Sequence, residues 1–155
     1  MNSVNCVNCQ AQRTENRYKG VRRFANNAVT LAGVGATGLL FRKGVNLALH
    51  EADKMLRSGD LNYKSNLIGT KTGNVLEFFE KMGNKIFKKG TKLGNAAKHY
   101  IIGQYPKGDD FSEIGKRTKL FKVRTVGAMA LTAGLTTLGL IARGIYKAGK
   151  INGEQ

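Results

Sequence analysis

The chain has 155 residues, enough for one domain with a core of its own. Lys and Arg number 26 against 10 Asp and Glu, which gives a net charge of +16. Hydrophobic residues make up 41% of the chain, which excludes a typical disordered protein. The large positive charge indicates an anionic partner, and we expect an anionic lipid surface or nucleic acid.

The first twenty residues are expected to form a polar tail without a secretory signal, because they lack an apolar run and a small-residue cleavage site. Both cysteines, Cys6 and Cys9, lie in this tail. A structural zinc site needs four ligands, and His50 and His99 are far away in the sequence. We therefore interpret the cysteines as a reduced pair and predict neither a metal site nor a cofactor.

The first apolar segment, residues 24–41, holds eighteen uncharged residues between Arg23 and Arg42. Eighteen helical residues span about 27 Å, against about 30 Å for the hydrocarbon layer of a bilayer. The segment is therefore expected to be a helix that crosses a membrane, lies on it, or forms half of a soluble core hairpin. Small residues four apart predict a face for close helix packing: Ala28, Ala32 and Ala36.

The same segment contains a GxGxxG motif at residues 33–38, which favours a different function. Residues 28–33 would then form a strand before the motif, and Asp53 lies twenty residues after Gly33, where a ribose-binding acid is expected. A dinucleotide-binding enzyme is the least favoured alternative, because residues 60–155 show helical faces rather than further strand–helix units.

The middle of the chain, residues 51–113, is predicted to form amphipathic helices with a charge close to balance. Residues 69–74 and 90–95 are a local repeat, and each copy is expected to open a helix. Apolar residues then recur at helical spacing: Val75, Phe79, Met82 and Ile86. Five lysines of this region are interpreted as a solvated face: Lys85, Lys88, Lys89, Lys92 and Lys98.

A second apolar segment, residues 125–142, again holds eighteen uncharged residues between two arginines. It resembles the first segment at a shift of 101 positions, at which Gly33 falls on Gly134 and Arg42 on Arg143. Its small residues predict a second close-packing face, and we expect the two segments to be adjacent helices: Gly127, Ala130 and Gly134.

These patterns predict a mainly α protein, with two related apolar helices around an amphipathic helical middle. The predicted parts are a polar tail, a basic block with the first apolar helix, the amphipathic middle, and a basic block with the second apolar helix: residues 1–20, 21–50, 51–113 and 114–155. Both basic blocks lack acids over long stretches, and we expect them to bind an anionic surface through these side chains: Arg22, Arg23, Arg42, Lys43, Lys116, Arg117, Lys119, Lys122, Arg124, Arg143 and Lys147.

No catalytic constellation is apparent in the sequence, so the favoured function is non-enzymatic. We expect a structural component of a larger assembly, membrane-associated or within a virus or phage particle, that contacts copies of itself or other proteins. The alternative is a soluble, basic, nucleic-acid-binding structural protein. High salt would release such a protein from its partner, because phosphate contacts depend on counterion release.

Overall fold

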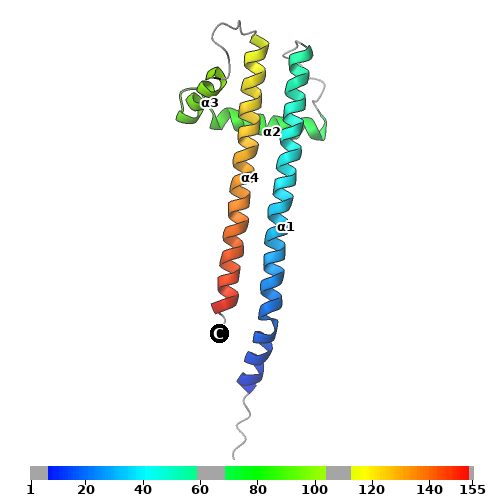
Figure 1. Cartoon of the computed structure of the whole chain (residues 1–155), viewed down its shortest axis with the longest axis vertical. Helices are drawn as coiled ribbons and strands as arrows, with labels where there is room; N and C mark the ends of the chain where they lie inside the picture. The colour runs from blue at the N-terminus through cyan, green and yellow to red at the C-terminus, as the bar shows by residue number, and fades with distance from the viewer. Residues whose placement is uncertain (1–6, 59–68, 104–112, 154–155) are drawn as a thin grey trace, which may run out of the picture. The chain divides into compact units, whose positions relative to one another are not determined.

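A computed structural model of the chain describes residues 7–58, 69–103 and 113–153 (Figure 1). Within these residues the fold is all-helical and contains no strand. The four helices are α1 (Val7–Ser58), α2 (Lys71–Ile86), α3 (Lys92–Gly103) and α4 (Glu113–Gly153). The mainly α prediction is confirmed, and each apolar segment lies inside one long helix.

The chain divides into two compact units, and both long helices contribute to each. The terminal unit consists of Met1–Gly38 and Gly134–Gln155, and the central unit of Leu39–Ala133. The four sequence-based parts remain a prediction. Cys6 and the side chain of Cys9 lie outside the described residues.

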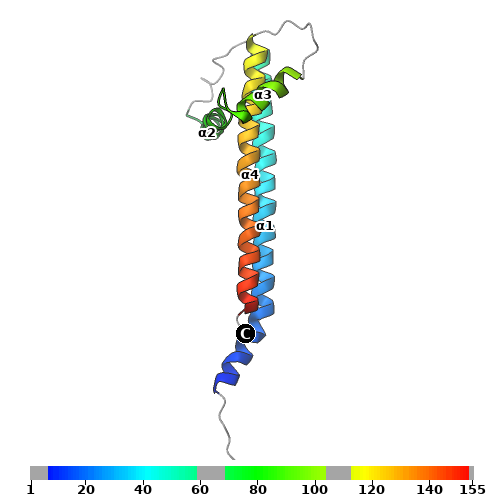
Figure 2. The same cartoon turned by 90° about the vertical axis from the view of Figure 1, so that its left-hand side faces the viewer.

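In the terminal unit the two helices pack through small and polar residues. The blue part of α1 from Lys19 onward lies beside the last part of α4, which is orange to red (Figures 1 and 2). The Asn26 side-chain amide donates a hydrogen bond to the Gly144 carbonyl at 3.1 Å. A Cβ on Gly144 would stand 2.8 Å from the Thr30 hydroxyl oxygen, so this approach requires glycine. Gly33 faces Leu140 more loosely, since a Cβ there would stand 3.1 Å from the end of the flexible Leu140 side chain.

This packing sets the register of the two apolar segments. If the segments were aligned end to end in antiparallel directions, Gly33 would lie opposite Ala133. Because Gly33 faces Leu140 instead, the segments are displaced by about two helical turns. The start of the first apolar segment therefore lies beside the basic last turns of α4, and a shared groove there includes Ala25 and Lys147.

The central unit has a conventional apolar core. Ala48 of α1, Leu76 of α2 and Met129 of α4 form one buried cluster, with α2 lying across the two longer helices. A second cluster contains Ala52, Met55 and Phe121. α2 approaches α4 closely at Gly83, where a Cβ would overlap the backbone carbonyl of Arg124.

The local repeat opens α2 and α3, as the sequence predicted, and both helices begin with the same Thr cap. The hydroxyls of Thr70 and Thr91 accept hydrogen bonds from the backbone N–H groups of Gly73 and Gly94, each at 3.0 Å. Such caps stabilise a helix by about 1 kcal/mol each. Gly69 and Gly90 precede the caps with φ values of 86° and 92°, a left-handed conformation that favours glycine.

The apolar face of α2 differs from the predicted one at its first residue, where Leu76 takes the place of Val75. Leu76 is buried, whereas Val75 is exposed, because α2 meets the other helices through Leu76, Phe79 and Gly83.

On the exposed side of α2, the Glu77 carboxylate and the Lys81 ammonium group form an ion pair at 2.6 Å. The hydrogen bond from Lys81 to Glu77 and the negative charge of Glu77 raise the pKa of Lys81. Surface pairs of this kind contribute little to stability.

Candidate functional site

A basic groove lies between α1 and α4 in the terminal unit. It has a volume of about 510 Å³, and both helices contribute cationic side chains to it. The basic lining consists of Arg22 from α1 and three residues of α4: Arg143, Lys147 and Lys150. The apolar lining consists of Ala25, Val29, Leu140 and Ile151. The combination suits a ligand that has both an anionic group and an apolar part.

Cationic residues outnumber acidic ones in the described part of the terminal unit around the groove. Residues 17–38 and 134–153 contain seven Lys and Arg and no Asp or Glu. Arg143 and Lys147 are four residues apart, and so share one face of α4. Lys150 lies in the last turn, where a cation also stabilises the helix through its dipole. Arg143 lies more than two turns before the end of α4, so its charge has no favourable interaction of this kind with the helix dipole.

The outer faces of the two helices are apolar and exposed. In the terminal unit, Phe24, Leu31 and Leu135 are 75%, 72% and 69% exposed. By length and composition, both α1 and α4 are long and apolar enough to cross a membrane. The most apolar eighteen residues of α1 are 0% buried and those of α4 are 17% buried, whereas the core helix of a soluble protein is mostly buried.

The small-residue faces predicted from the sequence lie away from the contact between α1 and α4. Ala28, Ala32 and Ala36 are exposed on α1. On α4, Ala130 is exposed, and a Cβ on Gly134 would meet no atom within 4 Å. Gly127 alone packs closely, against the ring of Phe87 in the central unit. A role for the exposed faces in contacts with other chains stays a prediction.

The predicted anionic-surface residues are distributed over both units. Arg22, Arg143 and Lys147 meet in the groove of the terminal unit. Four others are exposed on the long helices: Arg23, Arg42, Lys43 and Lys116. In the central unit, Lys119 and Lys122 are half-buried, and Arg117 and Arg124 line a second pocket.

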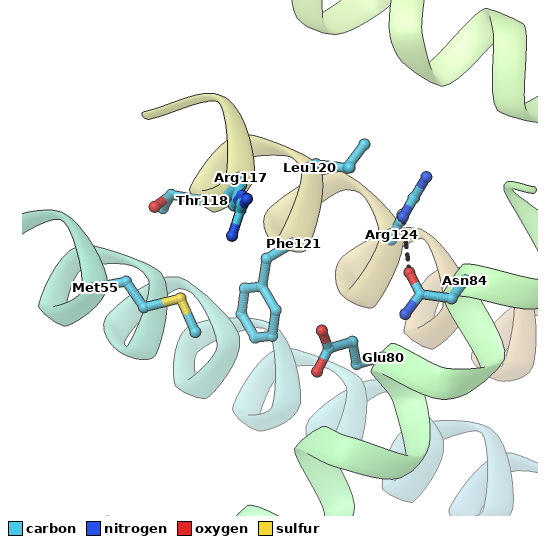
Figure 3. Close-up of a pocket in the computed structure, with 8 residues that line it drawn as sticks. All are labelled: Met55, Glu80, Asn84, Arg117, Thr118, Leu120, Phe121 and Arg124. Carbon is cyan, nitrogen blue, oxygen red and sulfur yellow. Dashed lines mark hydrogen bonds between the residues drawn. The ribbon is translucent and has the colours of Figure 1, made fainter. Parts of the chain in front are cut away.

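The second pocket, of about 270 Å³, lies in the central unit between α1, α2 and α4 (Figure 3). Met55 comes from α1, and Glu80 and Asn84 come from α2. The Arg124 guanidinium donates a hydrogen bond to the Asn84 side-chain oxygen at 2.9 Å. A carboxylate and two guanidinium groups share this pocket, so the charge of its lining is closer to balance than that of the basic groove.

Three polar side chains are buried inside the central unit. Glu51 is 3% exposed, and its Oε1 pairs with the Lys54 ammonium group at 3.4 Å. The Glu51 Oε2 and the hydroxyls of Thr118 and Thr125 have no hydrogen-bond partner among the described residues.

The GxGxxG motif at residues 33–38 lies in the middle of α1. Residues 28–33, expected as a strand in the dinucleotide-binding alternative, are helical, and Asp53 belongs to the same helix. A dinucleotide site needs these glycines in a turn between a strand and a helix, so α1 does not supply that geometry. Asp53 instead pairs with Arg57 at 2.9 Å.

Sequence reasoning missed the residues that complete the groove and hold the helices together. Lys150 was not selected, although it follows Lys147 on the same face. Asn26, Thr30 and Gly33 were not assigned to packing, although they recur at helical spacing. That recurrence of small and polar residues was the available signal, but the alanine series is more regular and was preferred for that reason.

Comparison with family models, curated proteins and solved structures found no match.

Proposed function

We propose that the protein is a non-enzymatic structural component of a larger assembly, anchored to a lipid membrane by α1 and α4. The apolar outer faces of the two helices enter the lipid, and the basic flanks bind its anionic surface. A virus or phage particle that contains or contacts a membrane is a setting that fits this composition.

The observation that supports this proposal is the reversed distribution of side chains in the terminal unit. The contact between the helices uses Asn26, Thr30 and Gly144, whereas large apolar side chains such as Leu31 and Leu135 face outward. In water this arrangement is unfavourable, because transfer of each large apolar side chain out of water lowers the free energy by about 1.5–3 kcal/mol. Lipid favours it, because helices in a bilayer associate through small residues and interhelical hydrogen bonds.

Fractionation of the full chain tests the proposal. We expect the protein to sediment with membranes, to stay there through washes with high salt and alkaline carbonate, and to enter solution only with detergent. Release by high salt alone would contradict membrane anchoring, because salt weakens ionic contacts and leaves apolar burial intact.

A pair of charged substitutions on the outer face gives a sharper test. Leu31→Asp and Leu135→Asp place a charge on exposed positions of the terminal unit, where a soluble protein would tolerate it within about 0.5 kcal/mol. In the hydrocarbon layer the same charge costs about 2.5–3.5 kcal/mol, so we expect both variants to lose membrane retention. The matched control is Val75→Asp, at an exposed apolar position on α2 outside both apolar segments.

The second candidate function is nucleic-acid binding, which the lysines of the central unit favour. All five are exposed: Lys85, Lys88, Lys89, Lys92 and Lys98. Removing them in pairs by Lys→Gln substitution would lower affinity for DNA of any sequence and flatten its salt dependence if they contact phosphates. Membrane anchoring predicts that the same variants keep their membrane retention.

A further inference from the structure

We infer that the basic groove of the terminal unit is a binding site for the phosphate headgroup of an anionic phospholipid, a step that rests on the proposed membrane anchoring. Arg22, Arg143 and Lys147 would contact the phosphate, and Lys150 would add to the local potential. The acyl chains would follow the exposed apolar faces of the same two helices.

The register of α1 and α4 brings the cations to the edge of the apolar faces. Because the apolar segments are displaced by about two turns, Arg143 and Lys147 line the same groove as Ala25 and Asn26. Asn26 and Asn27 interrupt the first apolar segment at this same level. Polar and cationic groups thus line one stretch of the helix pair, the arrangement expected where helices pass from hydrocarbon to headgroups.

Two exposed aromatic rings mark the same level. Phe24 is exposed within the part of α1 that forms the groove, and Tyr146 is exposed within the corresponding part of α4. Tyrosine is enriched at membrane interfaces, because its ring packs on acyl chains while its hydroxyl reaches the headgroups. Neither ring lines the groove, so the groove itself offers a ligand cationic, polar and aliphatic side chains.

The chemistry of the lining favours a lipid over a nucleic acid. Single-stranded nucleic acid is bound through aromatic side chains on which the bases stack, and none of the described residues that line the groove is aromatic. Val29, Leu140 and Ile151 border the cations instead. A phospholipid supplies both the phosphate for the cations and the apolar surface for these side chains.

A single tryptophan reports on the groove, since the chain contains no tryptophan of its own. The Tyr146→Trp variant is reconstituted into vesicles of phosphatidylcholine and phosphatidylglycerol in which one of the two lipids carries brominated acyl chains. We expect stronger quenching when the bromine is on the anionic lipid. Substituting Arg143 and Lys147 by Gln in this background should reduce the preference by about fivefold per charge removed.

The controls distinguish a specific binding site from the general effect of the protein's positive surface charge. Lys88→Gln with Lys89→Gln removes the same charge from exposed positions of the central unit and should leave the preference unchanged. Arg143→Lys keeps the charge and should retain most of the preference, which excludes loss of folding as the cause. Neither soluble glycerol phosphate nor an oligonucleotide should displace the anionic lipid.

Each other outcome overturns the inference. Equal quenching by both lipids in vesicles that carry the protein would contradict the headgroup site but would remain consistent with membrane anchoring. An equal loss in the Lys88→Gln, Lys89→Gln control would reduce the effect to net charge. Displacement by glycerol phosphate would indicate a site for free phosphate, and displacement by the oligonucleotide a nucleic-acid site. Failure of the protein to float with vesicles of either composition would overturn both proposals.

Discussion

In the central unit, α1 contributes Ala48, Ala52 and Met55 to an apolar core, whereas in the terminal unit the same helix meets α4 through Asn26, Thr30 and Gly33. The central unit has α2 to cover its long helices, and large apolar side chains such as Leu76 and Phe121 turn inward there. The terminal unit consists of α1 and α4 alone among its described residues, and most of its large apolar side chains are exposed.

The difference shows that one helix can follow opposite packing rules along its length. Where a third helix encloses the pair, burial of apolar surface stabilises the contact. Where only two helices meet, they have no enclosed interior, and the close contact depends on glycine and on polar groups that bond across it. Apolar faces left outside then need lipid or another chain, which is the basis of the membrane proposal.

The largest expected effect separates the two kinds of apolar side chain. Met55→Ala in the central core should lower the free energy of unfolding by about 2–5 kcal/mol. Met55 is only 7% exposed, so the loss of its side chain removes buried contacts and leaves a cavity. Leu31→Ala in the terminal unit should change it by less than about 0.5 kcal/mol, since Leu31 is exposed. Chemical denaturation of both variants in detergent, followed by circular dichroism, measures the difference. Equal losses would mean that the outer face of α1 is buried in the folded protein.

A second test concerns the crossing of α2 over α4. Gly83→Ala should destabilise the central unit by about 1–3 kcal/mol, because its Cβ overlaps the backbone carbonyl of Arg124, which cannot rotate away. Gly149→Ala is the control in the terminal unit, where a Cβ meets nothing within 4 Å. This control should instead stabilise α4 by about 0.5–1 kcal/mol through its higher helix propensity. Thermal unfolding that gives the same sign for both substitutions would contradict the close crossing.

The hydrogen bond in the terminal unit should have a smaller effect. Asn26→Ala removes the donor to the Gly144 carbonyl and should weaken the contact between α1 and α4 by about 0.6–1.5 kcal/mol. Asn27→Ala provides a matched control, because the neighbouring asparagine is exposed. Hydrogen exchange of the backbone amides around Gly144 is the measurement, and only Asn26→Ala should accelerate it. An equal response to both substitutions would indicate that the interhelical bond is not formed.

The smallest intrachain effect is expected at the small-residue faces. Ala32→Leu and Gly134→Leu add volume where Ala32 is exposed and a Cβ at Gly134 meets nothing, so the folding of one chain should change by less than about 0.5 kcal/mol. If the same faces join copies of the protein, both variants should dissociate the oligomer, whereas Leu39→Ile should leave it intact. Sedimentation in detergent reports the oligomeric state. Unchanged association in both Leu variants would show that these faces are incidental.

The sequence by itself determined the helical class, the two apolar segments, the placement of the positive charge and the starts of α2 and α3 at the local repeat. These features are local: apolar length, the number of charges and a repeated stretch of residues can be recognised without knowledge of the fold. Thr70 and Thr91 illustrate this, since each cap forms within its own repeat.

The tertiary structure alone decided which face of each long helix is the contact face. On α1, one series of small residues includes Ala28 and Ala32, and another includes Asn26, Thr30 and Gly33. Both recur at helical spacing, so periodicity cannot choose between them. The choice depends on Gly144 and Leu140 of the partner helix, which admit the second series and fix the displacement by about two turns. That displacement, rather than any motif, brings Arg22, Arg143 and Lys147 into one groove.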